Sequence, residues 1–348
     1  MADISFRVGL RGRPMHPAFL ETIAREPHIL MATFEDDAPA LAADLGASHG
    51  YYVSSARNEL PAAFHVTDEL IARMPSLLLV ATYGAGYDTV DVDACTRAGI
   101  AVVNQAGGNA EGVAEHALGM MLGLLKRMPE AHDAMRRGAV REREAFMGRE
   151  LTGRTVGIVG LGHVGSRTAK LLRAFDCRVL AYDPYLDEDT CAERGARKVD
   201  LARLLEESDI VTVHAPLDNA TRGMFGAAEY AQMRERAIIL NTARGEILDE
   251  AALFDALESG HLGGAGLDAW AQEPPPAGHP LLTHPAVIAT VHTGGVTYES
   301  RERVVIMAAE AFAAAARGET PPRIVNPDVT ARYRERWHAA FGGTTAAR

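Results

Sequence analysis

The residues from Gly160 to Gly165 spell G-x-G-x-x-G, a spacing that suits close contact between a peptide backbone and phosphate groups. Gly160 permits a tight turn, Gly162 leaves room for a pyrophosphate because it lacks a Cβ, and Gly165 lets a helix pack closely. The backbone N–H groups of His163 and Val164, at the start of that helix, would meet the phosphates. The pattern alone is a weak signal in a chain with 33 glycines, so its context decides its meaning.

An acidic residue, Asp183, stands 18 positions after the last glycine of this pattern, at the end of a predicted strand. At this spacing a carboxylate accepts hydrogen bonds from the adenosine ribose diol of a dinucleotide. The glycine pattern also follows a predicted strand and opens a predicted helix, which supports a dinucleotide-binding fold. Because Asp183 would repel the extra phosphate of NADP and no arginine is adjacent, we predict NAD as the cofactor.

Titratable residues stand at or just after the later predicted strands, where parallel sheets of this kind bind ligands. They are His214, Arg244, Asp268, Glu273 and His292. An arginine, a carboxylate and a histidine at successive strand ends converge on one place, which favours catalysis over independent structural roles. A dinucleotide fold by itself names no reaction, so the chemistry depends on further motifs.

The elements that position these residues alternate between strand and helix patterns, which predicts parallel, doubly wound α/β sheets. In the second half of the chain, strands are predicted at 155–160, 178–183, 210–214, 237–242, 264–268 and 287–291, with helices at 164–175, 201–207 and 250–259. In the first half, strands at 4–9, 29–33, 52–56, 76–81 and 100–104 and a helix at 19–25 predict a smaller α/β domain. Helix patterns also cover 110–126 and 302–317, and we interpret the Arg-rich segment 136–150 as a linking arm.

Six motifs stand in a recognisable order: Tyr83-Gly84-Ala85-Gly86-Tyr87-Asp88, Val113-Ala114-Glu115-His116, the glycine pattern with Asp183, Asn241-Thr242-Ala243-Arg244-Gly245, Glu273-Pro274, and His292. Over residues 76–327 the chain resembles the D-isomer-specific 2-hydroxyacid dehydrogenase family, and phosphoglycerate dehydrogenases most of all. The resemblance implies a Rossmann NAD-binding domain and a flavodoxin-like substrate domain, both doubly wound, with the active site in the cleft. It also implies hydride transfer between the nicotinamide and a D-2-hydroxy acid or 2-oxo acid.

The resemblance implies roles for single residues. Arg244 would bind the carboxylate and carbonyl oxygens of the substrate, His292 would act as acid and base, and Glu273 would orient His292 and favour its protonated form. The backbone N–H groups of Gly84 and Ala85 would bind the substrate carboxylate. The cofactor would contact Gly160, Gly162, His163, Val164, Gly165, Asp183, Ala215, Pro216, Thr242, Ala243, Asp268 and Gly294, with Asp268 accepting from the nicotinamide carboxamide.

Some residues depart from the family pattern or fall outside the catalytic set. Val291 stands where the family usually has a proline before the catalytic histidine. Ser54 stands where phosphoglycerate enzymes tend to have a basic residue that holds phosphate, so either Arg57 takes this role or the substrate lacks phosphate. We interpret His116 as a packing residue and His214 as a sheet-end residue near the cofactor.

The predicted substrate domain is discontinuous. It covers 1–107 and 302–330, with the NAD-binding domain at 108–301 and a C-terminal tail at 331–348 that holds a surface helix. We expect a homodimer, with the Met-rich stretch 119–125 and the arm 136–151 as its surfaces. The length leaves no room for the regulatory domain of the larger serine-pathway enzymes.

The composition argues against several other classes of protein. A formal net charge of −11 disfavours nucleic-acid binding. Three cysteines without C-x-x-C spacing argue against a disulfide framework or a thiolate metal site and favour the cytoplasm. No metal is expected, and no signal peptide or membrane span is readable.

Two other functions compete with that of a 2-hydroxyacid dehydrogenase. An NAD(H)-sensing binding protein, like the corepressors that resemble this family, can keep the same arginine, glutamate and histidine. A formate-dehydrogenase-like enzyme needs no proton transfer and carries glutamine where this chain has Glu273. The carboxylate therefore argues for a substrate hydroxyl group.

Overall fold

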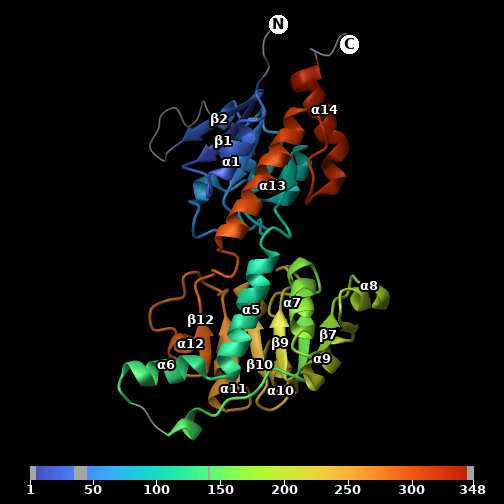
Figure 1. Ribbon diagram of the computed structural model, residues 1–348. Helices are drawn as coiled ribbons and strands as arrows, with labels where there is room; N and C mark the ends of the chain where they lie inside the picture. Colours follow the sequence, from blue (N-terminus) through green and yellow to red (C-terminus); the bar gives the residue numbers. More distant parts are fainter. Residues whose placement is uncertain (1–4, 35–44, 140–141, 343–348) are drawn as a thin grey trace. The chain divides into compact units, whose positions relative to one another are not determined.

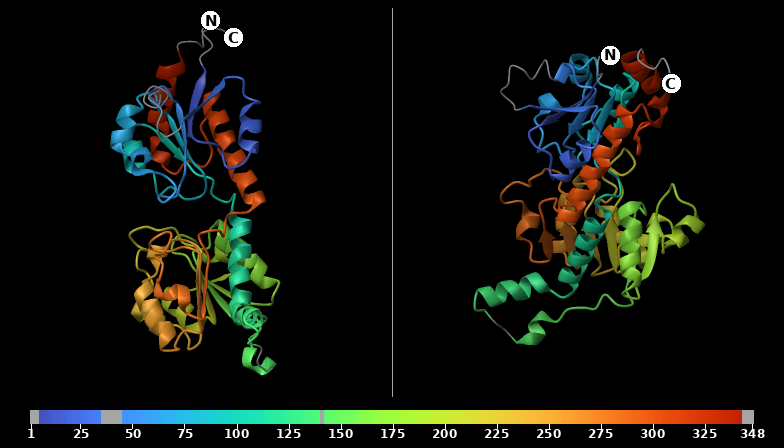
Figure 2. Two further views of the ribbon diagram at one scale, coloured as in Figure 1. Left: turned by 90° about the vertical axis from the view of Figure 1, so that its left-hand side faces the viewer. Right: turned by 45° about the horizontal axis from the view of Figure 1, so that its top comes forward.

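The computed structural model describes residues 5–34, 45–139 and 142–342 (Figures 1 and 2). These residues form two compact units, each described here by itself. Unit one contains the described residues as far as Asn109 and those from Tyr298 onward, and unit two runs from Ala110 to Thr297. Each unit has a parallel sheet flanked by helices, which confirms the predicted α/β class.

Unit one is built on a five-stranded parallel sheet with the order β2-β1-β3-β4-β5. Its strands are β1 (Phe6–Arg11), β2 (Ile29–Phe34), β3 (Gly50–Val53), β4 (Leu79–Thr82) and β5 (Ala101–Val103). Its described helices are α1 (Ala18–Ile23), α3 (Asp68–Arg73), α4 (Val92–Arg97), α13 (Tyr298–Ala316) and α14 (Thr330–Phe341), with short 3-10 turns η1 (Ala62–Phe64) and η4 (Pro327–Val329). This strand order is that of a flavodoxin-like sheet.

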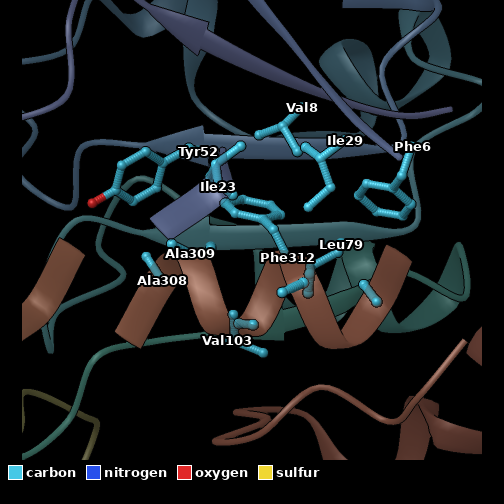
Figure 3. Packing of buried hydrophobic residues seen from close by; sticks show 14 of the residues in the cluster. Phe6, Val8, Ile23, Ile29, Tyr52, Leu79, Val103, Ala308, Ala309 and Phe312 are labelled. Carbon is cyan, nitrogen blue, oxygen red and sulfur yellow. The ribbon is translucent and has the colours of Figure 1, made fainter. Parts of the chain in front are cut away.

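Alternate residues of the strands in unit one point to opposite faces, and both faces are buried. In β3, Tyr52 packs with α1 and α13 on one face, whereas Tyr51 and Val53 pack with α3 and α4 on the other. Figure 3 shows the first face, where Phe312 extends from α13 toward the sheet. A Cβ at Gly50 would stand 2.7 Å from the Phe312 ring, so glycine at this position lets α13 pack closely.

The C-terminal helix α14 contributes to the core of unit one. Tyr333 is 1 % and Phe341 is 8 % exposed, and the Trp337 indole N–H donates to the Ala315 carbonyl at 2.8 Å. The helix predicted in this tail is therefore present as α14, which packs one face on the core of unit one and leaves its other residues at the surface. The reason is that aromatic residues at helical spacing bury one face of α14.

Unit two is built on a seven-stranded parallel sheet with the order β12-β11-β10-β9-β6-β7-β8. Its strands are β6 (Thr155–Val159), β7 (Arg178–Tyr182), β8 (Arg197–Lys198), β9 (Ile210–Val213), β10 (Ile238–Asn241), β11 (Gly264–Leu267) and β12 (Val287–Ala289). Its described helices are α5 (Ala110–Leu125), α6 (Met128–Arg136), α7 (His163–Arg173), α8 (Glu188–Glu193), α9 (Leu201–Glu207), α10 (Ala227–Gln232), α11 (Glu250–Glu258) and α12 (Pro280–Thr283), with 3-10 turns η2 (Arg143–Phe146) and η3 (Gly245–Ile247). Counted from β6, this order contains the Rossmann order, which confirms the predicted Rossmann domain, and it has one further strand at the β12 edge.

Helices cover both faces of the sheet in unit two. Met120 and Met121 of α5 pack on one face together with α7, and Leu204 of α9 and Leu253 of α11 pack on the other. Met120 and Met121 are 4 % and 0 % exposed, so these two methionines face the sheet, and the dimer surface predicted at 119–125 stays a prediction for the remaining residues. These methionines face inward because a parallel sheet needs cover on both of its faces.

The segment after α5 projects from the rest of unit two (Figures 1 and 2). Helix α6 buries none of its residues, and Met128, Met135 and Met147 are 58 %, 66 % and 71 % exposed. Residues 140 and 141 of the predicted arm lie outside the described chain. Within the described ranges, no helix is long and apolar enough to cross a membrane.

Candidate active site

The glycine pattern connects β6 to α7 beside β9, where the strand order of unit two reverses. Gly160 has a φ of +87°, and a Cβ there would stand 2.8 Å from the Ala215 backbone nitrogen. A Cβ at Gly165 would stand 2.1 Å from the Gly160 carbonyl oxygen, so α7 begins this close only because residue 165 is glycine. No described atom, in contrast, lies within 4 Å of a Cβ built at Gly162. This open space at the N-terminus of α7 fits a pyrophosphate.

Asp183 stands just after β7 and contacts the same turn. Its Oδ2 accepts from the Leu161 N–H at 2.9 Å, and its Oδ1 accepts from the Tyr185 N–H at 3.0 Å. A carboxylate has about four acceptor positions, so this one retains capacity for two ribose hydroxyls. The Arg194 guanidinium donates to the Leu161 carbonyl at 2.6 Å. Arg194 is thus a cation next to the turn that sequence spacing did not reveal.

Arg244 follows β10 on a loop that Asn241 holds in place. The buried Asn241 amide donates to the Arg244 carbonyl at 2.8 Å, and its Oδ1 accepts from the Ala243 N–H at 3.0 Å. A Cβ at Gly245 would stand 1.8 Å from the Trp270 carbonyl carbon, so only glycine fits this contact. These contacts fix the backbone from which the Arg244 guanidinium extends.

Glu273 and His292 form a hydrogen-bonded pair. His292 Nδ1 lies 2.8 Å and 3.0 Å from the two carboxylate oxygens of Glu273. His292 has a φ of +57°, an uncommon conformation for a residue with a side chain. Its backbone N–H donates to the Asp268 carbonyl at 2.8 Å, which secures this conformation. The His292 side chain is still 38 % exposed, so a small molecule can reach the ring.

Glu273 raises the pKa of His292 through this hydrogen bond and also through its charge. Burial lowers the same pKa, as does the nearby Arg244 guanidinium, while the Asp268 carboxylate adds to the rise. The net direction is upward, which favours a protonated imidazole near neutral pH.

Asp268 anchors the loop that carries His292. Its carboxylate is 1 % exposed and accepts from the Thr290 hydroxyl at 2.6 Å and from the N–H groups of Thr293 and Gly294, each at 2.8 Å. The cofactor contacts assigned to Asp268 and Gly294 stay predictions. The structure adds that the bond between the Asp268 carboxylate and the Gly294 N–H helps to anchor the loop that carries His292.

His214 and His116 each have polar partners in unit two. His214 Nε2 lies 3.1 Å from the Thr212 hydroxyl and Nδ1 lies 3.3 Å from the Thr242 hydroxyl, and burial lowers the pKa of His214 to about 4. A neutral ring with both nitrogens engaged suits a structural role. His116 Nε2 on α5 lies 3.1 Å from Thr290 Oγ1, so α5 contacts the loop that Asp268 anchors.

In unit one, Gly84 and Ala85 follow β4. The Gly84 carbonyl accepts from the Gln105 N–H at 2.9 Å and from the Thr82 hydroxyl at 3.0 Å, and the Asn104 amide donates to the Ala85 carbonyl at 2.8 Å. In a trans peptide the N–H points opposite to the preceding carbonyl. The Ala85 N–H is therefore directed away from Gln105 and Thr82.

Ser54, just after β3, has a carboxylate rather than a cation beside it. Its hydroxyl donates to the Glu59 carboxylate at 2.7 Å. Arg57 is exposed, and its Nε donates to the Asp88 carbonyl at 2.9 Å. Arg57, which was predicted to hold a substrate phosphate, is thus already bonded through its Nε atom. The acidic Glu59 stands only two positions further along the chain.

Sequence reasoning named the charged residues of the site and missed the residues that hold them. Asn241 belongs to a recognised motif, but the motif does not indicate that its amide bonds to the Arg244 carbonyl. Thr290 and Trp270 were given no role, although both bond to the elements that carry Glu273 and His292. Their partners are distant in sequence, so residue type alone carried no signal.

The glycine turn and the carboxylate at the end of β7 are features of a dinucleotide-binding α/β protein, and the hydrogen-bonded His292–Glu273 pair has the chemistry needed for proton transfer. Residues 118–294 match the family model described as D-isomer specific 2-hydroxyacid dehydrogenase, NAD binding domain. The chain belongs to the D-isomer-specific 2-hydroxyacid dehydrogenase family. This match confirms the resemblance and supports NAD as the cofactor.

Among its relatives, the chain is 38 % identical to a D-3-phosphoglycerate dehydrogenase of Archaeoglobus fulgidus over 75 % of this chain and 49 % of that protein. It is 39 % identical to a glyoxylate reductase of Korarchaeum cryptofilum over 75 % of this chain and 80 % of that protein. A solved D-lactate dehydrogenase from Aquifex aeolicus, in a complex with NAD and lactic acid, is 27 % identical with a TM-score of 0.78 and covers 92 % of this chain and 99 % of its own. The chain spans about half the length of the phosphoglycerate dehydrogenases that it matches.

Proposed function

We propose that the protein is an NAD-dependent dehydrogenase that interconverts D-2-hydroxy acids and 2-oxo acids. The observation that carries the proposal is the 2.8 Å contact between His292 Nδ1 and Glu273, in the same unit as the glycine turn. Oxidation of a hydroxyl group removes a proton as well as a hydride, so it needs an acid–base residue. An NAD(H)-sensing protein can keep the same residues, so turnover of a 2-oxo acid is the property that separates the two functions.

NADH held at the glycine turn and Asp183 would supply the hydride for reduction of the substrate carbonyl group. Protonated His292 donates its Nε2 proton to the carbonyl oxygen, and Glu273 stabilises the cationic ring through Nδ1. Arg244 binds the substrate carboxylate and carbonyl oxygen and so orients the reacting bond. In the reverse direction, neutral His292 accepts the hydroxyl proton. From the resemblance, we assign the N–H groups of Gly84 and Ala85 to the substrate carboxylate.

We further propose that the substrate carries no phosphate. The relatives named above include enzymes of both kinds, a D-3-phosphoglycerate dehydrogenase and a glyoxylate reductase. The Ser54 hydroxyl bonds to Glu59, which holds a negative charge where a phosphate enzyme would place a cation. Burial raises the pKa of Tyr83 to about 12, with Arg11 lowering it and Glu59 raising it, so Glu59 also acts on the residue next to Gly84. A phosphate dianion would be repelled there.

The test is NADH oxidation with 3-phosphohydroxypyruvate, hydroxypyruvate, glyoxylate and pyruvate. We expect turnover, with kcat/KM for one unphosphorylated acid at least about tenfold above that for the phosphorylated one, a 1.4 kcal/mol difference. Glu59→Gln should narrow this gap. A preference for 3-phosphohydroxypyruvate that Arg57→Ala abolishes would instead make Arg57 the phosphate ligand. NADH binding without turnover of any 2-oxo acid would favour the sensor and refute the proposed activity.

We also propose a homodimer formed through the projecting segment, which consists of α6 and the described residues of the arm. Met128, Met135 and Met147 are exposed on this projecting segment, and large exposed apolar side chains of this kind favour association. Sedimentation should give a dimer at micromolar concentration, and charged substitutions at Met128 and Met135 should shift it toward monomer. A wild-type monomer would contradict this part of the proposal.

A further inference from the structure

Trp270 contacts both sides of the acid–base pair. It lies three residues beyond β11 and is 3 % exposed. Its backbone N–H donates to Glu273 Oε1 at 3.1 Å, and its indole N–H donates to the Thr290 carbonyl at 2.9 Å. Glu273 Oε1 is the oxygen that lies 2.8 Å from His292 Nδ1, and Thr290 is two residues before His292. One buried residue therefore holds the carboxylate and also the chain that carries the imidazole.

Residue 291 itself contributes little to holding the backbone before His292. A proline at position 291 would fix its own φ and restrict residue 290, but Val291 does neither. Val291 is 72 % exposed, so packing does not hold it. His292 itself has a left-handed backbone, which is an unfavourable conformation for a residue with a Cβ. The bonds at Thr290 on one side and at Asp268 on the other hold this conformation.

We propose that Trp270 is a positioning residue whose indole N–H fixes Thr290 and thereby keeps His292 Nδ1 against Glu273. This inference rests on the proposed function, because it assigns Trp270 a part in that site. The indole bond is buried, and a buried hydrogen bond between rigid groups is well shielded from competing water. Phenylalanine can occupy the same space but has no N–H, so Trp270→Phe removes the bond while keeping an aromatic ring.

The chain offers a matched control, because Trp337 makes the same kind of bond in unit one, from its indole N–H to the Ala315 carbonyl at 2.8 Å. We expect Trp270→Phe to lower kcat about tenfold, as small displacements of catalytic groups do, with NAD affinity unchanged. A looser Glu273 contact lowers the pKa of His292, so the loss of reduction activity at high pH should move to lower pH. Trp337→Phe should leave kcat and the pH profile as in wild type. Wild-type kcat and pH profile in Trp270→Phe would overturn the inference.

A second measurement needs neither turnover nor a stable Trp270 variant. The chain has two tryptophans, so its ¹⁵N–¹H spectrum holds two indole signals, and Trp337→Phe assigns them. The Trp270 signal should shift with pH as His292 titrates and should lose that step in His292→Gln. The His279 ring, paired with Glu250, also lies 5.6 Å from Trp270, and a step that survives in His292→Gln belongs to it.

The two measurements separate the inference from the function on which it rests. A Trp270 signal that responds to pH identically in wild type and His292→Gln would refute the coupling, even in an active enzyme. A coupled signal in a protein that turns over no 2-oxo acid would keep the coupling and refute the proposed activity. The charged groups that act on His292 in this experiment are Glu273, Arg244 and Asp268.

Discussion

His292 Nδ1 lies 2.8 Å from Glu273 Oε1, although the two residues are 19 positions apart in the chain. Glu273 follows β11 and His292 follows β12, and these strands are neighbours in the parallel sheet of unit two. Their carboxyl ends therefore meet at one edge, where Arg244 also follows β10. The hydrogen bond from Glu273 raises the pKa of His292 and so favours the protonated form of its ring.

Replacing His292 by Gln should lower kcat about 10³-fold, because general acid–base catalysis contributes on this scale. NAD affinity should change little, since the glycine turn lies elsewhere in unit two. Stopped-flow turnover and fluorescence titration with NADH measure the two effects. His28→Gln, at an exposed position in unit one, is the matched control. Near-normal turnover of the His292 variant would remove His292 from the mechanism.

Replacing Glu273 by Gln should shift the pH dependence as well as lower kcat about 10²-fold. The carboxylate raises the pKa of His292, so its loss lowers that pKa. Reduction uses the protonated ring, which means that its rate falls as pH rises through this pKa. The fall should therefore occur at lower pH in the variant, as kcat/KM measured across pH will show. An unmoved profile would mean that Glu273 does not support the imidazole.

Replacing Arg244 by Lys should raise KM for the 2-oxo acid and lower kcat/KM about 10²-fold. Lysine keeps the charge, but it cannot present the planar fork that contacts two oxygens at once. Saturation kinetics at fixed NADH will separate KM from kcat. Arg222→Lys, an exposed pair with Glu246, is the control. Wild-type KM in Arg244→Lys would argue against a two-point contact with substrate.

Replacing Asp183 by Ala should weaken NADH binding about tenfold through loss of hydrogen bonds to the ribose. It should also relax discrimination against NADPH, because the repelling carboxylate is gone. Arg194, which donates to the Leu161 carbonyl of the turn, is then the cation that we expect to contact a 2′-phosphate. The double variant with Arg194→Ala should lose any gained NADPH affinity. If the wild-type protein preferred NADPH to NADH, the assignment of Asp183 to the ribose hydroxyls of NAD would be wrong.

His214 should make the apoprotein less stable in mild acid. Burial lowers its pKa from 6.5 to about 4. Above pH 6.5 the ring is neutral in both the folded and unfolded states and contributes nothing. Below pH 6.5 the unfolded state gains a proton that the folded state does not, so the free energy of unfolding falls by up to about 3 kcal/mol by pH 4. Denaturant unfolding measured between pH 6.5 and pH 4 should show a smaller fall in the free energy of unfolding for His214→Gln than for the wild type. An equal fall in both proteins would contradict the prediction.

Much of the fold could be predicted because local patterns report burial. The apolar runs before Gly160 and Asp183 coincide with β6 and β7, and the glycine spacing marks the start of α7. The two-residue strand β8 is too short to carry a pattern. The methionines of α5 were misplaced because an apolar helix looks the same whether its cover is a sheet or a second subunit.

By itself, the sequence determined the sheets, the glycine turn and the identities of Arg244, Glu273 and His292, since each depends on residue type and near spacing. Only the tertiary structure decided what holds them. Trp270 bonds to Thr290 across 20 positions, and Asp268 bonds to Gly294 across 26. Likewise, only the packing of α14 on unit one shows that its aromatic side chains are buried. Hydrogen-bond partners and packing faces depend on how strands and helices are arranged in space. This arrangement brings together residues that are far apart in the sequence, so no local sequence pattern links them.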